Sequence, residues 1–172
     1  TVSDTSLTVT VFNYPNVSIT TNPSFAVCYG SVAQVIGSGA NSYSFSWNGV
    51  PQSTTGNSFQ SSLFEDGDIV TVTGFNGKCP SASVDQFVNV FKMNLALTAS
   101  PNSMLCNGES VTVSASGANT YQFILNGSLQ GGFSTNSSFS PAISDGDTIR
   151  FIGKSTSTGC SQNSESIVVS VY

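Results

Sequence analysis

Hydrophobic and polar residues alternate along most of this chain with a period of two. In residues 111–115, valine and alanine alternate with serine and threonine, and residues 121–125 and 167–171 follow a similar pattern. This alternation is typical of antiparallel strands that bury one face. No stretch combines the 3.6-residue period of an amphipathic helix with helix caps. The pattern predicts an all-β protein.

Turn residues separate the predicted strands at short intervals. Asn48-Gly49 and Asn126-Gly127 form the dipeptide that suits a two-residue hairpin, because both positions tolerate positive φ. Gly67 and Gly146 stand between acidic residues just before a strand. About seven short strands in roughly 80 residues predict a β-sandwich, most simply an immunoglobulin-like one.

The same pattern occurs twice, in the same order and at an almost constant offset. The matching pairs are Cys28 with Cys106, Gly39–Phe45 with Gly117–Phe123, Asn48-Gly49 with Asn126-Gly127, Phe59 with Phe139, Asp66–Asp68 with Asp145–Asp147, and Cys79 with Cys160. The offset grows only from 78 (106 − 28) to 81 (160 − 79) residues. We therefore expect two tandem immunoglobulin-like repeats, residues 13–91 and 92–172.

Residues 1–12 resemble the end of such a repeat. Val9-Thr10-Val11-Phe12 has the pattern of Val88–Phe91 and of Val169–Tyr172, so residues 1–12 are expected to be the last strand of a preceding, truncated repeat. Between Val84 and Thr98 there is no linker rich in glycine, proline or serine. The closing strand of one repeat is thus expected to lead almost directly into the opening strand of the next repeat. We therefore expect neighbouring repeats of the same chain to be its interaction partners.

Four cysteines, two in each repeat, indicate disulfides and an oxidising compartment. Without histidine or a CxxC spacing, they are not a pattern for a metal site. The simplest pairing lies within repeats, Cys28–Cys79 and Cys106–Cys160, and we take it as the prediction. The alternative joins Cys28 to Cys160, because in a seven-strand sandwich the two cysteines of one repeat fall at opposite ends.

Composition and charge narrow the functions that the chain can have. Only 8% of the residues are charged, the net charge is −5, and Lys and Arg number four. No basic patch can therefore neutralise several phosphates, which excludes nucleic acid and a polybasic membrane contact. No apolar run approaches the roughly 18 residues of a membrane span. The chain has no histidine, the commonest acid–base catalyst, so we expect a non-catalytic protein without a cofactor.

Two acidic turns are candidates for calcium binding. Their carboxylates are Glu65, Asp66, Asp68, Asp145 and Asp147. Calcium binds six to eight oxygens and favours carboxylates. The alternative is that these residues form a tight turn through hydrogen bonds to the backbone. The sequence leaves both interpretations open.

Aromatic residues suggest two further candidates. Tyr43, Phe45 and Trp47 occur with a period of two and match the row at 121–125, so we expect them in the core and not on a sugar-binding platform. Phe75 and Phe133 lie near turns and are the candidate ligand-binding residues, with surface polysaccharide or another substratum as the partner.

Taken in order, the motifs resemble a known family. They are Cys-x-Gly, Ser-Gly-Ala-Asn-x-Tyr-x-Phe, Asn-Gly, Asp-Gly-Asp, a second cysteine and a final Val-x-Val-aromatic. They look like the tandem Ig-like and PKD-like repeats of large Bacteroidetes cell-surface adhesins, including SprB-like gliding-motility adhesins. The resemblance implies an extracellular, cell-surface location and a structural role as a spacer in a long filament. The alternative is a carbohydrate- or protein-binding module of a secreted multidomain protein.

Overall fold

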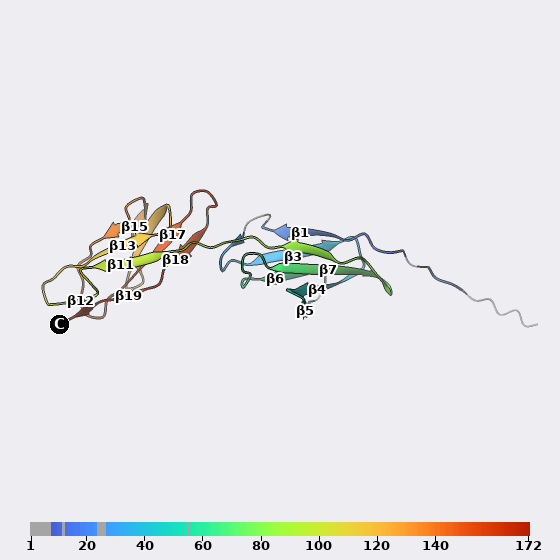
Figure 1. The fold of residues 1–172 in the computed structure, drawn as a ribbon, viewed down its shortest axis with the longest axis horizontal. Coiled ribbons are helices and arrows are strands. Elements are labelled where there is room, and N and C mark those ends of the chain that lie inside the picture. The colour runs from blue at the N-terminus through green and yellow to red at the C-terminus, as the bar shows by residue number, and fades with distance from the viewer. Residues whose placement is uncertain (1–7, 12, 24–26, 55) are drawn as a thin grey trace, which may run out of the picture. The chain divides into compact units, whose positions relative to one another are not determined.

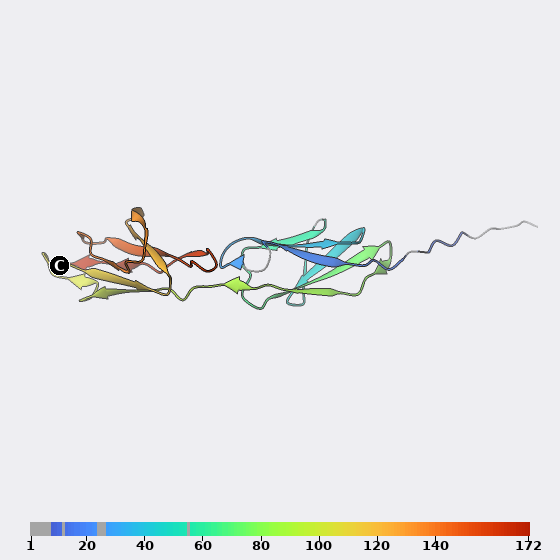
Figure 2. The same cartoon turned by 90° about the horizontal axis from the view of Figure 1, so that it is seen from above.

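The computed structural model describes residues 8–11, 13–23, 27–54 and 56–172. The chain divides into two compact units, Thr1–Val90 and Phe91–Tyr172. In the described residues all regular secondary structure is β-strand, as Figures 1 and 2 show from two directions. The prediction of an all-β fold built from β-sandwich modules is confirmed.

The first unit contains ten short strands. They are β1 (Ser18–Asn22), β2 (Val27–Cys28), β3 (Ala33–Ser38), β4 (Ser42–Trp47), β5 (Val50–Gln52), β6 (Ser58–Ser61), β7 (Ile69–Asn76), β8 (Cys79–Pro80), β9 (Val84–Phe87) and β10 (Val90–Phe91), whose last residue opens the second unit. One sheet has the order β1-β3-β6, and the other has the order β5-β4-β7-β8 with β9 also paired to β7. A short separate ladder joins β2 to β10.

The second unit repeats this arrangement strand for strand. Its strands are β11 (Ala96–Ser100), β12 (Met104–Leu105), β13 (Thr112–Ser116), β14 (Thr120–Leu125), β15 (Ser128–Ser134), β16 (Ser138–Phe139), β17 (Thr148–Lys154), β18 (Ser161–Asn163), β19 (Ile167–Val168) and β20 (Ser170–Val171). Its sheets have the orders β11-β13-β16 and β15-β14-β17-β18, with β19 paired to β17 and β12 paired in parallel to β20. The repeat seen in the sequence is therefore a repeat of topology.

Ten segments arise where about seven strands were expected because the first and last strands are interrupted. In the first unit β1 pairs with β3 in one sheet, whereas β2 pairs with β10. A cis proline, Pro23 or Pro101, follows β1 or β11 in the respective unit. The opening segment of the unit thus contributes first to the β1-β3-β6 sheet and then to the β2–β10 ladder, so it connects the two layers along one edge of the sandwich.

The alternating residues form one core in each unit. Val70 and Val72 on β7 are completely buried, as are Ile149 and Phe151 on β17. Phe45 is buried, and Tyr43 and Trp47 are half-buried and pack against the same cluster. The expectation that this aromatic row belongs to the core is confirmed.

The Asn-Gly turns have the predicted geometry. Asn48 and Gly49 have φ values of 48° and 80°, and Asn126 and Gly127 have 48° and 81°. Both dipeptides join strands in the tight register expected of a two-residue hairpin, for example Trp47 opposite Val50. A tyrosine on the strand that leads into each turn contributes a second restraint: its hydroxyl donates to a backbone carbonyl three residues earlier, at 2.9 Å in the first unit and 2.7 Å in the second.

The expected strand at residues 1–12 falls largely outside the described residues, which exclude 1–7 and 12. Residues 8–11 form no strand, and the side chains of Val9 and Val11 are exposed. The interpretation of residues 1–12 as the end of a preceding repeat stays a prediction.

Candidate functional sites

The acidic turns form the same network of hydrogen bonds in both units, and we call this network the latch. In the first unit, Asp68 accepts from the side-chain amide of Asn48 at 2.7 Å and from the backbone N–H of Glu65 at 2.9 Å. Asn48 in turn accepts from the N–H of Ile69 at 2.9 Å. Asp66 accepts from the N–H of Val90 at 3.0 Å. The carboxylates thereby connect the hairpin, the turn and the closing strand.

The second unit reproduces each of these contacts. Asp147 accepts from the side-chain amide of Asn126 at 2.6 Å and from the N–H of Ser144 at 2.7 Å. Asp145 accepts from the N–H of Val171 at 2.9 Å. Matching networks in two copies of different sequence indicate a structural requirement of the fold, because each carboxylate satisfies backbone donors that a loop would otherwise leave to water.

The aspartates that were candidates for calcium binding already accept hydrogen bonds. The ion needs six to eight oxygens, whereas at least one oxygen of each of the four aspartates already accepts from an N–H group. Among the described residues there is no group of three or more His, Cys, Asp or Glu side chains that could hold a metal ion. Of the two interpretations that the sequence left open, the geometry favours the turn.

The latch also lowers two carboxyl pKa values. Partial burial acts to raise the pKa of Asp68, but the hydrogen bonds from Asn48 and Glu65 outweigh it, and the pKa lies below its ordinary value of 3.8. The hydrogen bond from Asn126, followed by that from Ser144, lowers the pKa of Asp147. Both groups therefore favour the folded state when they are ionised.

Acid is expected to weaken both units through these two aspartates. Because their folded-state pKa values lie below 3.8, their stabilisation is present above that pH and is lost as the pH falls through the folded-state pKa. The double variant Asp68→Asn, Asp147→Asn should have a lower Tm at neutral pH and a shallower fall of Tm between about pH 5 and pH 2.

Thermal unfolding at a series of pH values measures this effect. Glu165→Gln is the matched control, since it removes a carboxylate outside the latch and should retain the wild-type slope. An equally steep fall in the double variant would contradict the role of the latch.

The cysteines are not paired as expected. Cys28 and Cys160 are each disulfide-bonded, whereas Cys106 is an exposed free cysteine. The predicted pairs Cys28–Cys79 and Cys106–Cys160 are therefore wrong. The disulfide indicates an extracellular or otherwise oxidising environment.

The distance along one strand explains this outcome. Cys28 follows Val27, whose N–H donates to Asn89 just beyond β9, and β9 pairs with the start of β7. Cys79 instead pairs with Asn76 at the end of β7. A strand of this length spans more than about 20 Å, whereas a disulfide needs its Cα atoms within about 7 Å. The two cysteines of one unit thus lie at opposite ends of it.

The two candidate ligand-binding phenylalanines have different surroundings. Phe75 is half-buried on β7, opposite Ser42 and Pro80 in neighbouring strands. Phe133 lies on β15 with 42% of its surface exposed, and the Nζ atom of Lys154 stands 5.7 Å from the centre of its ring. Of the two, only Phe133 offers an aromatic face of any size to a ligand.

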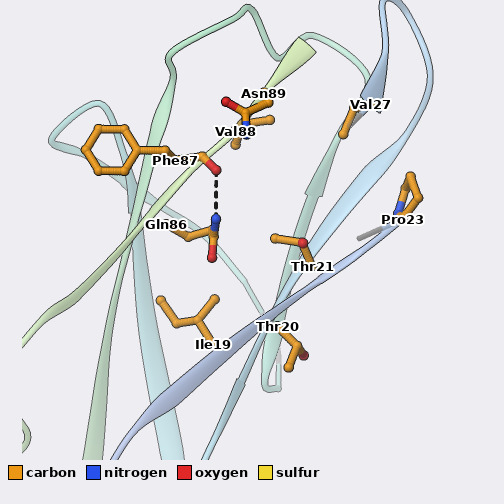
Figure 3. Close-up of a pocket in the computed structure, with 9 residues that line it drawn as sticks. All are labelled: Ile19, Thr20, Thr21, Pro23, Val27, Gln86, Phe87, Val88 and Asn89. Atoms are coloured by element: carbon orange, nitrogen blue, oxygen red, sulfur yellow. Dashed lines mark hydrogen bonds between the residues drawn. The ribbon is translucent and has the colours of Figure 1, made fainter. Parts of the chain in front are cut away.

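A further phenylalanine, which sequence reasoning missed, borders a groove in the first unit (Figure 3). Phe87 is 60% exposed, at the end of β9. The groove has a volume of about 430 Å³ and is lined by uncharged residues: Ile19, Thr20, Thr21, Pro23, Val27, Gln86, Phe87, Val88 and Asn89. The side chain of Gln86 donates to the carbonyl of Phe87 at 2.7 Å. The corresponding position of the second repeat is Val168, and this difference was the available sequence signal.

Comparison with known proteins supplies no family. No family model matches the chain, and no curated protein matches it. Among solved structures, it is similar to one described as "Structures of Clostridium thermocellum CbhA fibronectin(III)-like modules", with 11% identity over 90% of this chain and 95% of that chain and a TM-score of 0.35. Likeness at this level carries no functional argument. The chain's own strands define its class, a tandem array of immunoglobulin-like β-sandwich modules.

The described part of the chain was also searched for a membrane span. It contains no helix that is long and apolar enough to cross a bilayer.

Proposed function

We propose that this chain is a non-catalytic spacer from the stalk of a long extracellular adhesin at a bacterial cell surface, with a role in attachment or gliding motility. The observation that carries the proposal is the strand-for-strand repetition of one module, including the hydrogen-bonded acidic turn that both copies share. The same four aspartates that could have served chemistry or metal binding hold the turns of that module. The order of motifs shared with large Bacteroidetes surface adhesins supports the proposed location.

The connector between β10 and β11 supports the spacer role. It comprises residues 92–95, in which Met93 is buried. The N–H of Met93 donates to the side chain of Gln162 at 2.9 Å, and the Gln162 amide donates back to the Met93 carbonyl at 3.1 Å. Residues 92–95 are thus packed into the second unit and do not form a linker rich in glycine, proline or serine.

A binding module is the second candidate, and the groove beside Phe87 is the observation that favours it. The amide and hydroxyl side chains of the groove can accept from or donate to the hydroxyls of a neutral sugar, although the Phe87 ring points away from the other lining side chains (Figure 3). The absence of charged residues from the lining fits an uncharged ligand.

Retention on solid supports tests the spacer against the binding module. The full chain is passed over cellulose, chitin, starch and agarose, and over glass beads, with calcium and with a chelator. We expect no specific retention, and the same elution for the wild type and for Phe87→Ala and Phe133→Ala. Leu129→Ala is the matched control, since Leu129 is exposed to a similar degree and lies outside the groove.

A specific interaction would overturn the spacer proposal. Its signature is retention on one polysaccharide that falls at least about tenfold in Phe87→Ala or Phe133→Ala and persists in Leu129→Ala. Retention that requires calcium would also revive the metal interpretation of the acidic turns.

A further inference from the structure

Four asparagines of this chain are followed directly by glycine: Asn48, Asn76, Asn107 and Asn126. In such a dipeptide the backbone nitrogen of the glycine can attack the side-chain amide of the asparagine, because glycine has no Cβ atom to obstruct the close approach. The attack requires that the asparagine side chain turn toward that nitrogen. The four sites are therefore distinguished by how firmly the structure holds each side-chain amide.

The latch holds the side-chain amides of Asn48 and Asn126 at both ends. The Nδ2 group of Asn48 donates to Asp68 at 2.7 Å, and its Oδ1 atom accepts from the N–H of Ile69 at 2.9 Å. Asn126 makes the matching pair of bonds at 2.6 Å and 2.9 Å. Both amides are thus bonded through their donor and their acceptor, and both bonds must break before the side chain can turn.

Asn107 lies in a turn of a different kind. The N–H of Glu109 donates to the carbonyl of Cys106 at 3.0 Å, and Gly108 has a φ of 91°. The backbone N–H of Asn107 donates to the carbonyl of Tyr172 at 2.8 Å. Its side chain is exposed and makes no hydrogen bond to the described residues of the chain. The turn therefore fixes the backbone of Asn107 and leaves the side-chain amide able to rotate.

The first repeat shows that this turn does not need an asparagine. Tyr29 occupies the equivalent position there. The N–H of Ser31 donates to the carbonyl of Cys28 at 2.9 Å, and Gly30 has a φ of 76°, so the turn has the same form. A side chain of another type is compatible with this backbone, which agrees with a side chain of Asn107 that has no structural task.

We propose that Asn107 is a site of spontaneous deamidation and that the latch protects Asn48 and Asn126 from the same reaction. All three side chains are exposed, so access of water does not distinguish them. The hydrogen bonds of the latch distinguish them, because a latch asparagine reacts only after a local opening. The proposal goes beyond the spacer function and does not depend on it.

Asn76 is expected to react at an intermediate rate. Its Oδ1 atom accepts from the N–H of Asn41 at 3.1 Å, and its Nδ2 group donates to the carbonyl of Asn13 over the longer distance of 3.5 Å. These bonds are longer than those of the latch, and neither has a carboxylate as its acceptor. Hydrogen bonds to charged groups are the stronger ones, so Asn76 is held less firmly than the latch asparagines.

The reaction proceeds in two balanced steps. The backbone nitrogen of Gly108 loses its proton to a solvent base and attacks the Cγ atom of Asn107. The bond between Cγ and Nδ2 breaks, and the leaving group takes up a proton and departs as ammonia, which leaves a cyclic imide. One water molecule then opens the imide at either carbonyl and gives aspartate or isoaspartate. The net change is the hydrolysis of one amide, in which nothing is oxidised or reduced.

The modified residue would lie beside the ladder that closes the second unit. Leu105 on β12 and Val171 on β20 are partners in this parallel ladder, and the N–H of Tyr172 donates to the carbonyl of Leu105 at 2.9 Å. Isoaspartate adds a methylene group to the backbone where Asn107 bonds to the carbonyl of Tyr172. We therefore expect faster hydrogen exchange at the Tyr172 amide in the isoaspartate form.

The test stores the folded full chain in mildly alkaline buffer and follows each Asn-Gly peptide by mass spectrometry. Deamidation at Asn107 should be at least about tenfold faster than at Asn48 or Asn126, with Asn76 between them. Asn107→Gln is the matched control, because its longer side chain closes a larger and less favourable ring. It should remove the main product and leave the other three rates unchanged.

Two comparisons separate the effect of the fold from that of the dipeptide. In urea the four sites should react at similar rates, because no latch is then present. In folded Asp147→Ala the Asn126 amide loses its carboxylate acceptor, and its rate should rise at least about threefold, while Asn48 in the same molecules keeps its slow rate. Circular dichroism verifies the fold, and Asp147→Asn, which keeps the size of the side chain, replaces the alanine variant if that variant is unfolded.

Three results would overturn the inference. They are equal rates at Asn107 and the latch asparagines in the folded chain, the same differences between sites in urea as in the folded state, and an unchanged rate at Asn126 in a folded Asp147 variant. None of them bears on retention by polysaccharides, so failure here is distinguishable from failure of the spacer function.

Discussion

Replacing Gly117 by alanine is expected to destabilise the second unit by about 3–5 kcal/mol. Gly117 has a φ of 92°, in the left-handed region that strains any residue with a side chain. A Cβ atom there would also overlap the carbonyl oxygen of Asn94 and lie 2.7 Å from its carbonyl carbon and 3.0 Å from the Cα of Leu95. These are backbone atoms, so no rotamer change can relieve the overlap, and the two backbone segments must separate.

Gly39 offers the same test in the first unit. It has a φ of 91°, and a Cβ atom would overlap the carbonyl oxygen of Asn16. Urea unfolding followed by two signals separates the units, because Trp47, the one tryptophan of the chain, lies in the first unit. Gly117→Ala should lower the transition seen by far-UV circular dichroism and affect tryptophan fluorescence less, whereas Gly39→Ala should lower the fluorescence transition.

Gly132→Ala is the matched control for these variants. Gly132 lies on β15, has no positive φ, and a Cβ atom there meets nothing within 4 Å. Its replacement should change stability by less than about 0.5 kcal/mol. If Gly117→Ala were as stable as Gly132→Ala, the close approach of the two backbone segments would not exist in solution.

Phe151→Ala is the second substitution with a large expected effect, about 3–5 kcal/mol. Phe151 is completely buried at the centre of β17. Its ring lies 5.5 Å from that of Tyr121 and 6.1 Å from that of Phe123, between centroids. Truncation removes the contacts of the whole ring and leaves a cavity that two fixed strands cannot close. A unit of this size has a total stability on the order of 4–12 kcal/mol, so the change consumes a large part of it.

Phe133→Ala is the control for the loss of an aromatic ring. The Phe133 side chain is 42% exposed, and the Lys154 ammonium group lies 5.7 Å from the centre of its ring. Its removal should cost at most about 1 kcal/mol. The two variants are compared by urea unfolding under circular dichroism. Equal losses of stability would mean that the core does not lie where the alternating pattern places it.

The fold could be predicted largely from local sequence. Strand positions follow from alternation, because side chains on a strand point to opposite faces and only one face of each strand can be buried. The Asn-Gly turns follow from backbone sterics, because few residues tolerate two successive positive φ values. The repeat could be found by comparing the chain with itself. Each of these signals depends on residues that are close in sequence or equivalent in the two copies.

The candidate functional sites depend on contacts between residues that are distant in the sequence. For that reason the sequence alone did not decide between their alternative interpretations. Asp66 and Asp68 accept hydrogen bonds from the N–H groups of Val90 and Glu65 and from the amide of Asn48, and the local sequence does not reveal these contacts. The exposure of Phe87 could not be predicted from the sequence, because Phe87 continues an alternating strand and its exposure depends on a sheet edge that the local pattern does not reveal.

The cysteines show most clearly which properties the local sequence determines and which depend on the tertiary structure. Composition and spacing by themselves determined that the chain is an all-β repeat and that its cysteines belong to an oxidising environment. The tertiary structure decided that the two cysteines of the first unit do not pair, because the length of β7 separates Cys28 from Cys79 and a disulfide tolerates only a few ångströms between its Cα atoms. Periodicity is a property of neighbouring residues, whereas a covalent bond between distant residues depends on where the folded strands end.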